Sequence, residues 1–421
     1  MQVVGSSKPV SAGPFKRTAH LLVSWRLLRL AAPAYIALML AVWGVLFYLW
    51  FGGTNGRDRS GVVLGPDFPA FYTGGLLVRQ GSAQELYDLE QQRALQHLFV
   101  SSKTLSAYVN PPHYAFVAIP FSMLPYGAAF LVWSACMVSA FVASISLLRS
   151  ILPALRGSSG SLLCALALLA APVYYALSAG QNTGLSLLLH SGILLALAQR
   201  RDGLAGLLIA LGLFKPQLFV VLLPLLLLGK HWRALASFSI AALLLGGLTL
   251  WFWGWAAVHD WVAVLRSPLY QSEEVRQASK MFSWQPLWLL VFGQGLLANM
   301  LGWTCAAAVF VGLGWIWWRG TGELPLRYAI TLLGMIVIGP HLPVYDLALL
   351  ILPGLVLIDR LLRWPAHEWV ELRVSLLAVY VLTLFAANAE LQASLVLVPC
   401  ITLLGCLATH LLLAARRVPA R

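Results

Sequence analysis

Long apolar segments recur along the whole chain, and short polar stretches separate them. The first runs from Leu28 to Phe51 and the last from Leu391 to Ala414. Each is about 24 residues long, whereas a helix that crosses a bilayer needs roughly 20. The pattern predicts an all-α polytopic integral membrane protein. Its single transmembrane domain is expected at 28–414, between a basic cytoplasmic amino terminus at 1–27 and a cytoplasmic tail at 415–421.

Several apolar stretches are too short for a simple crossing. They are Pro112 to Leu124, Leu204 to Phe214, Leu218 to Leu228 and Tyr328 to Ile338. Short segments of this kind are typical of broken or re-entrant helices, which a membrane protein tolerates where a protein core or a wet cavity satisfies the backbone. We therefore expect a bundle of about 10 to 14 transmembrane or re-entrant helices around a polar cavity.

The longest polar stretch, 52–111, lies between the first two hydrophobic regions. Within it Leu86, Leu89, Leu95 and Leu98 recur at helical spacing among charges of both signs. This spacing predicts amphipathic helices that lie at the membrane interface.

Composition and charge support the membrane assignment and indicate an orientation. The chain is 60% hydrophobic and 10% charged, with a formal net charge of +13. Its basic residues are scattered among short loops, which is typical of the positive-inside rule and not of a nucleic-acid-binding face. Because 1–27 carries basic and no acidic residues, we expect it in the cytoplasm. The stretch 52–111 and the polar breaks "AGQNTG", "FKPQ" and "GPHLPVYD" then fall on the outer side.

The chain lacks the motifs of several enzyme classes. It has no HExxH, no Walker loop, no GxGxxG after a strand and no GxSxG elbow, and no two of its five cysteines form a CxxC pair. A metalloprotease, an ATPase and a serine hydrolase are therefore not expected, and nothing in the sequence suggests a metal or another cofactor.

Asp67 is the first candidate for chemistry. It follows Gly65 and Pro66 at the point where the chain turns into an aromatic, glycine-containing run. An aspartate here is suited first to cap a helix, and beside an apolar wall it is also suited to act as a general base. The local sequence leaves both interpretations open.

Polar residues in the breaks are the other candidates. Lys215 lies among leucines, where an ammonium is costly unless it meets an anion such as phosphate; the alternative is a lysine in an external turn. His341 could donate a hydrogen bond to a leaving phosphate or serve structure alone. The remaining candidates for lining the cavity are Gln181, Asn182, Tyr345 and Asp346. Another outer loop is expected from Ala256 to Lys280, and its basic residues are expected to be solvated, or to guide an anionic headgroup: Arg266, Arg276 and Lys280.

Five phrases together resemble glycosyltransferase family 87, the polyprenyl-phosphate-mannose-dependent mannosyltransferases with the GT-C membrane fold. The resemblance runs from about Leu28 to about Leu357. It rests on "GPDFPAFYTGGLLVRQGSAQELYD", "YVNPPHYAFVAIPFSMLPYGAAFLVW", "GQNTGLSLLL", "LFKPQLFVVLLPLLLLGKHWRA" and "GPHLPVYDLALLILP".

The resemblance implies a function and a place for it. It implies inverting transfer of a sugar, mannose or arabinofuranose, from a polyprenyl phosphate to the hydroxyl of a lipid or glycan acceptor. The reaction would take place on the outer face of a bacterial cytoplasmic membrane, among membrane lipids and without nucleic acid. GT-C enzymes place an essential acid in the first outer loop, where Asp67 lies. Lys215 and His341 would stabilise the departing phosphate.

Two other functions are compatible with the residues alone. A transporter or flippase of an anionic lipid would also contain broken helices and a buried lysine. A non-catalytic scaffold of an envelope assembly would tolerate replacement of Asp67, Lys215 and His341.

Overall fold

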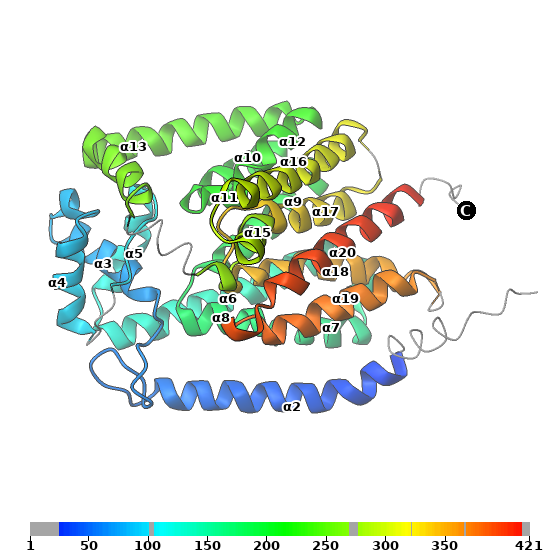
Figure 1. The fold of residues 1–421 in the computed structure, drawn as a ribbon, viewed down its shortest axis with the longest axis horizontal. Coiled ribbons are helices and arrows are strands. Elements are labelled where there is room, and N and C mark those ends of the chain that lie inside the picture. The colour runs from blue at the N-terminus through cyan, green and yellow to red at the C-terminus, as the bar shows by residue number, and fades with distance from the viewer. Residues whose placement is uncertain (1–24, 101–104, 269–276, 321, 366–367, 415–421) are drawn as a thin grey trace, which may run out of the picture.

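A computed structural model describes residues 25–100, 105–268, 277–320, 322–365 and 368–414 (Figure 1). In these ranges the chain is helical, with two isolated β-bridges, Arg57 to Val63 and Met281 to Pro343, and no longer strand. The predicted all-α class is therefore confirmed. Most of the predicted amino-terminal segment, the tail at 415–421 and Arg276 lie outside the described residues.

Six candidate spans in the described ranges are long and apolar enough to cross a membrane. They are α2 (Trp25–Trp50), α6 (Tyr126–Ile151), α7 (Ser158–Leu168) continued by α8 (Ala171–Ala179), α13 (Trp232–Leu265), α16 (Leu296–Trp318) and α20 (Ser394–Ala414). These helices confirm a polytopic membrane protein.

Shorter helices fill the space between the spans. They are α5 (Ala115–Ser122), α9 (Thr183–Ala198), α10 (Asp202–Leu211), α11 (Pro216–Phe219), α12 (Leu222–Leu228), α15 (Trp284–Phe292), α17 (Leu324–Ile338), α18 (Ile351–Leu361) and α19 (Val370–Leu382). The apolar stretches that were expected to be too short for a crossing all lie in this group. Short 3-10 turns connect many of them: η3 (Pro153–Arg156), η4 (Gly212–Phe214), η5 (Ala278–Lys280), η6 (Val344–Leu350), η7 (Thr383–Phe385) and η8 (Ala389–Leu391).

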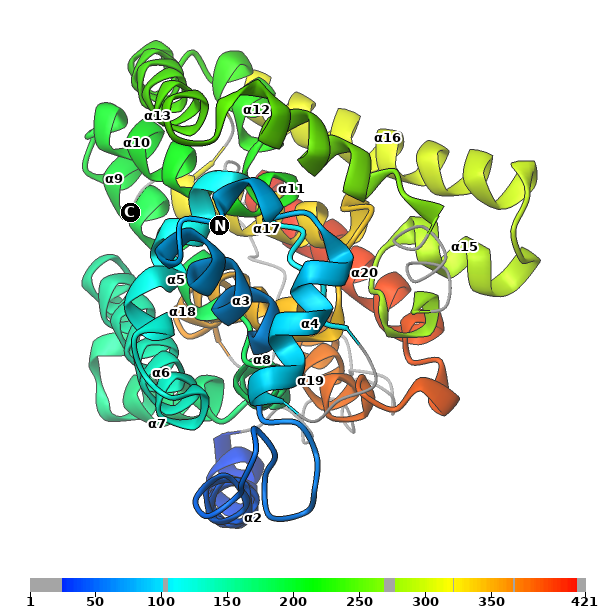
Figure 2. The same ribbon diagram turned by 90° about the vertical axis from the view of Figure 1, so that its left-hand side faces the viewer.

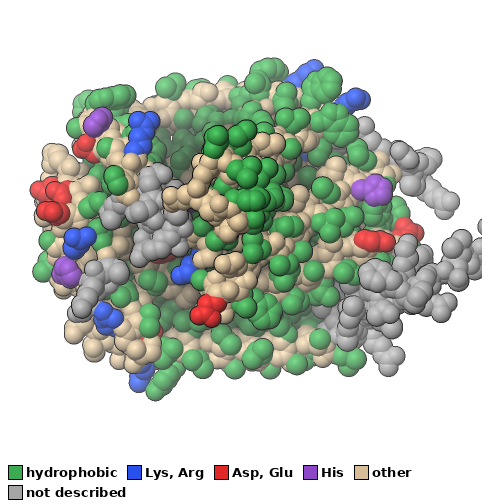
Figure 3. Space-filling model, viewed as in Figure 1, with side chains coloured by type: hydrophobic (Ala, Val, Ile, Leu, Met, Phe, Trp, Pro, Cys, Tyr) green, Lys and Arg blue, Asp and Glu red, His purple; other side chains and the backbone are tan. Residues whose placement is uncertain are grey.

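One end of the bundle gathers the basic loops that the charge pattern assigned to one side. Asp359 accepts a hydrogen bond from the Ala154 N–H at 2.8 Å and pairs with Arg363. Arg360 pairs with Glu323 at 2.6 Å. These contacts join η3, α18 and the start of α17 at the end drawn on the right of Figure 1. Figure 3 shows the same face with charged side chains mainly toward its two ends and hydrophobic side chains between them.

The opposite end carries the long polar loop, folded into α3 (Phe68–Arg79), η1 (Ala83–Glu85) and α4 (Leu89–Phe99), and followed by η2 (Pro112–Tyr114). In Figure 2, which looks onto this end, α3 and α4 lie in front of the bundle. The Asp88 carboxylate caps α4 by accepting the N–H groups of Glu90 and Gln91 at 2.9 and 3.0 Å.

The buried face of α4 contains glutamines as well as apolar residues. Leu89 and Leu95 pack against the core, whereas Leu98 is 80% exposed, and Gln92 and Gln96 are buried. Both glutamine side chains bond to backbone groups of neighbouring segments, and these bonds offset the cost of burying an amide. The leucine spacing predicted the helix but not its two buried glutamines.

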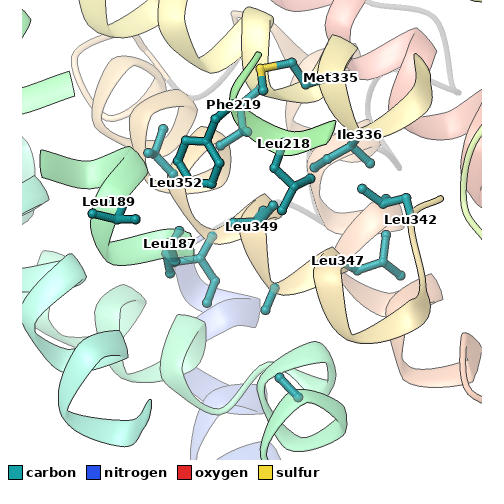
Figure 4. Close-up of a cluster of buried hydrophobic side chains, with 14 of the residues drawn as sticks. Leu187, Leu189, Leu218, Phe219, Met335, Ile336, Leu342, Leu347, Leu349 and Leu352 are labelled. Carbon is teal, nitrogen blue, oxygen red and sulfur yellow. The ribbon is translucent and has the colours of Figure 1, made fainter. Parts of the chain in front are cut away.

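Broken helices meet in the hydrophobic core. Figure 4 shows leucines of α9 beside Leu218 and Phe219 of α11, Ile336 of α17 and Leu349 of η6. Leu218, Phe219, Ile336 and Leu349 are each at most 1% exposed. The break at Lys215 comes directly before α11, and the break around residue 341 comes directly before η6. Because α11 and η6 both pack in this core, the two breaks lie close together in space.

Close helix packing gives one stability prediction. A Cβ added to Gly206 in α10 would lie 2.0 Å from the Ala234 carbonyl oxygen in α13, whereas one added to Gly203 of the same helix meets no atom within 4 Å. Because backbone cannot yield easily, Gly206→Ala is expected to cost about 1–3 kcal/mol and to lower the melting temperature in detergent. Gly203→Ala is the matched control; an equal effect of the two would contradict the packing account.

Candidate functional site

A cavity of about 670 Å³ lies at the end of the bundle that carries α3 and α4. Its walls come from the start of α3, one face of α4, the segment 105–111, the break at 214–217, the end of α13 and the segment 341–346. The sequence-predicted residues that line it are Asp67, Gln181, Lys215, His341, Tyr345 and Asp346. Elements far apart in the sequence are thus brought to one space.

Asn182 is the predicted site residue that does not line the cavity. It is fully buried, and its amide donates a hydrogen bond to the Tyr114 hydroxyl at 2.9 Å. The Tyr114 ring in turn stacks on Phe214, with 4.9 Å between the ring centroids. Asn182 therefore supports the wall behind the break at Lys215.

Asp67 occupies the N-cap position of α3, yet its side chain makes no capping hydrogen bond. Its backbone N–H donates to the Ala179 carbonyl at 2.9 Å, and its carboxylate accepts a hydrogen bond from the Gln181 amide at 2.8 Å. The capping interpretation is therefore wrong for the side chain, which is turned toward the cavity instead.

Burial raises the pKa of the Asp67 carboxyl above its usual range. The hydrogen bond from Gln181 and the positive charges of Lys215 and His341 oppose this rise, and the negative charge of Asp346 adds to it. Desolvation is the largest effect because the carboxylate has left water without a cation bonded to it. A carboxylate with a raised pKa binds a proton more strongly and is a better general base.

Lys215 is paired with an internal acid. Its ammonium lies 2.8 Å from Oδ1 of Asp346, and the Thr183 hydroxyl donates to the same oxygen at 2.8 Å. The Lys215 and Asp346 residues are 7% and 1% exposed, so the interpretation of Lys215 as a residue in an external turn is wrong. Asp346, which was expected to line the cavity, does so and is also the partner of Lys215.

The pairing still leaves Lys215 with hydrogen-bonding capacity. An ammonium has three N–H donors, and the ion pair with Asp346 uses one of them. The ring of Tyr345 lies 5.2 Å from the ammonium and adds a cation–π contact. Lys215 is therefore held in place at the cavity wall by neighbours on two sides.

Comparison with known proteins decides the class of enzyme. The model of glycosyltransferase family 87 matches residues 108–353, more than half of the chain. The chain belongs to glycosyltransferase family 87. It is therefore a membrane glycosyltransferase, and the transporter and scaffold alternatives do not describe it. No curated protein and no solved structure matched.

The matched region of the glycosyltransferase contains Gln181, Lys215, His341 and Asp346, whereas Asp67 precedes it. Asp67 joins them through two bonds that cross between the segments: its N–H to Ala179 and its carboxylate to Gln181. These two bonds attach the first loop to the matched region of the chain at Asp67.

Other lining residues were not identified from the sequence. Arg93 and Gln96 of α4 face the cavity, as do Asn110 and Trp261. Asn110 donates to the Phe214 carbonyl at 3.0 Å, and Trp261 to the Val109 carbonyl at 2.9 Å. The spacing of Arg93 and Gln96, which lie on one helix face with Leu89, was a signal in the sequence that the leucine pattern alone did not reveal.

The basic residues of the loop from Ala256 to Lys280 do not line the cavity where the structure describes them. Neither Arg266 nor Lys280 lines the cavity. Their expected role in guiding an anionic headgroup therefore has no support from the cavity wall.

Gln181 provides a pH-dependent prediction. Its hydrogen bond lowers the pKa of Asp67, so Gln181→Met is expected to raise that pKa further. If Asp67 acts as a base, it works only when deprotonated, and the acidic limb of the pH profile of kcat/KM should move to higher pH. Glycosyl transfer measured across pH in the variant and the parent enzyme checks this; an unmoved or lowered limb contradicts it.

Proposed function

We propose that this glycosyltransferase moves a sugar from a polyprenyl-phosphate donor to an acceptor hydroxyl with inversion at the anomeric carbon. The single observation that carries the proposal is the Asp67 carboxylate, which faces a polar cavity, bonds to Gln181 and has a pKa raised by burial. One positioned base is sufficient for an inverting displacement.

The proposed chemistry involves one bond formed and one broken at the anomeric carbon. The acceptor oxygen attacks that carbon while Asp67 takes the hydroxyl proton. The bond between the anomeric carbon and the phosphate oxygen breaks, and polyprenyl monophosphate leaves with the bonding electron pair. Asp67 later returns the proton to water. The N–H donors of Lys215 and the imidazole of His341 are proposed to contact the phosphate, whose negative charge grows as the bond breaks.

The proposed donor fits both the family and the setting of the cavity. The motifs of the chain resemble the mannosyltransferases of family 87 that depend on polyprenyl-phosphate mannose. Mannose is therefore the favoured sugar, and arabinofuranose is the alternative. Helix α13, whose end lines the cavity, also exposes large side chains, including Trp251 and Trp255. A donor with a long isoprenoid chain could remain in lipid while its head group enters a polar space.

The side and the cofactor requirement are also proposals. The basic loops gather at one end of the bundle and the cavity lies at the other, so the positive-inside rule favours a cavity on the outer, periplasmic side of a bacterial cytoplasmic membrane. We propose a metal-independent reaction, because Asp67 is not part of a D-x-D or E-x-D pair.

Reconstituted enzyme tests the proposal. Vesicles that contain the purified protein, polyprenyl-phosphate mannose labelled in the sugar and a membrane extract as acceptor source are expected to yield a labelled product with the opposite anomeric configuration. Polyprenyl-phosphate arabinofuranose and a nucleotide-linked mannose are the comparison donors. Transfer from the nucleotide sugar alone, or retained configuration, would overturn the proposed donor or mechanism.

A further inference from the structure

Arg93 is a cation that lines the cavity, but it has no part in the ion pair of Lys215 or in the chemistry proposed for Asp67. It lies on α4, and it lines the cavity together with Leu89 and Gln96 of the same helix. Residues at these spacings share one helix face. The guanidinium forms no ion pair or hydrogen bond with any residue that the structure describes.

The backbone that carries Arg93 is held firmly. The side-chain amide oxygen of Gln92 accepts the Tyr108 N–H at 2.7 Å. The Gln96 amide donates to the Ser106 carbonyl at 2.7 Å and accepts the Ser106 N–H at 3.1 Å. These bonds fasten α4 to the segment 105–111, which forms another wall of the cavity. Arg93, which lies between the two glutamines, is therefore presented from a fixed helix and not from a loose loop.

Arg93 adds positive charge to the cavity where the charge of Lys215 is already compensated. Lys215 is paired with Asp346, and Asp67 contributes a negative charge while it is ionised. Once Asp67 has taken the acceptor proton, Asp346 is the remaining lining carboxylate, and Lys215 and Arg93 together outnumber it. Arg93 therefore makes the cavity more attractive to an anionic group.

We propose that Arg93 binds the phosphate group of the polyprenyl-phosphate donor and of the polyprenyl monophosphate product. This inference rests on the proposed function and adds to it an arginine whose positive charge binds the phosphate. A guanidinium presents paired N–H donors that match phosphate oxygens, which an ammonium already bonded to a carboxylate does not.

Binding of two lipids tests the role of Arg93 without requiring catalysis. Purified Arg93→Gln, Arg93→Lys and parent enzyme are titrated with polyprenyl phosphate and with the uncharged polyprenol, and tryptophan fluorescence follows binding because Trp261 lines the cavity. Arg79→Gln is the matched control, since Arg79 is an exposed cation on neighbouring α3 that does not line the cavity.

Arg93→Gln is expected to weaken binding of polyprenyl phosphate by roughly 10- to 100-fold and to leave binding of polyprenol unchanged. Arg93→Lys should lose less, and Arg79→Gln should match the parent. Equal affinity of the parent and Arg93→Gln for polyprenyl phosphate overturns the proposal, as does an equal loss for both lipids. If Arg93→Gln fails to fold, the comparison rests on Arg93→Lys, and an unchanged affinity there overturns the proposal.

The outcome separates this inference from the proposed function. Arginine-dependent binding of polyprenyl phosphate in an enzyme that transfers no sugar from it would support the phosphate site and reject the function. Transfer with an unchanged KM for the donor in Arg93→Gln would support the function and reject the phosphate site.

Discussion

Asp67→Asn is expected to lower kcat for sugar transfer by about 1,000-fold or more, within the range that a positioned general base contributes. Asparagine has the shape of aspartate and keeps an oxygen that can accept the 2.8 Å hydrogen bond from Gln181. The substitution therefore removes the proton acceptor with little change in packing. Because the raised pKa of Asp67 arises from burial, the parent enzyme should also lose activity as the pH falls through a value above that of an ordinary aspartate.

Two further measurements make the Asp67→Asn result interpretable. The melting temperature and the affinity for polyprenyl phosphate should stay close to those of the parent enzyme, which places the loss in the chemical step. Asp58→Asn is a control in the same loop, because Asp58 is bonded only within the loop and does not line the cavity. Full turnover by Asp67→Asn would sink the assignment of Asp67 as base.

Lys215→Met is expected to have the largest combined effect on stability and activity. It leaves Asp346, which is 1% exposed, without its cation, and removing one partner of a buried pair typically costs about 3–5 kcal/mol. The Thr183 hydroxyl remains as a donor to Asp346 and offsets part of that cost. A lower melting temperature in detergent and loss of sugar transfer are the measured outcomes.

A double variant separates the structural role of Lys215 from its proposed role at the phosphate. Lys215→Met combined with Asp346→Leu removes both charges, and replacing a buried ion pair by apolar side chains is often neutral for stability. The double variant is therefore expected to melt at a higher temperature than Lys215→Met alone and to remain inactive. Recovery of activity together with stability would show that Lys215 acts only in folding.

The membrane class and most of the residues that line the cavity followed from the sequence, because both depend on patterns that lipid enforces. Long apolar runs predict spans, and apolar runs too short for a crossing predicted breaks at Lys215 and His341, which the structure brings to one cavity. Burial of a lysine among leucines also required an anion nearby. That anion proved to be Asp346, whose distance from Lys215 along the chain gave no sign of the pairing.

The sequence did not predict which distant segments contact one another. The capping residue of a helix and a cavity-facing carboxylate share the same local pattern, and only the approach of Gln181 distinguishes them at Asp67. The leucine spacing of α4 did not reveal that two glutamines are buried beside the leucines, because these glutamines bond to backbone groups of other segments. Arg93 was missed because its importance depends on the cavity that it faces.

A structure of the Asp67→Asn variant with polyprenyl-phosphate mannose bound tests the central claim most directly, because the inactive variant should hold the donor without consuming it. The sugar is predicted to occupy the cavity, with residue 67 facing the anomeric carbon on the side opposite the phosphate and Arg93 contacting the phosphate oxygens. A donor bound outside this cavity, or a phosphate lying on the same side of the anomeric carbon as residue 67, would contradict the account.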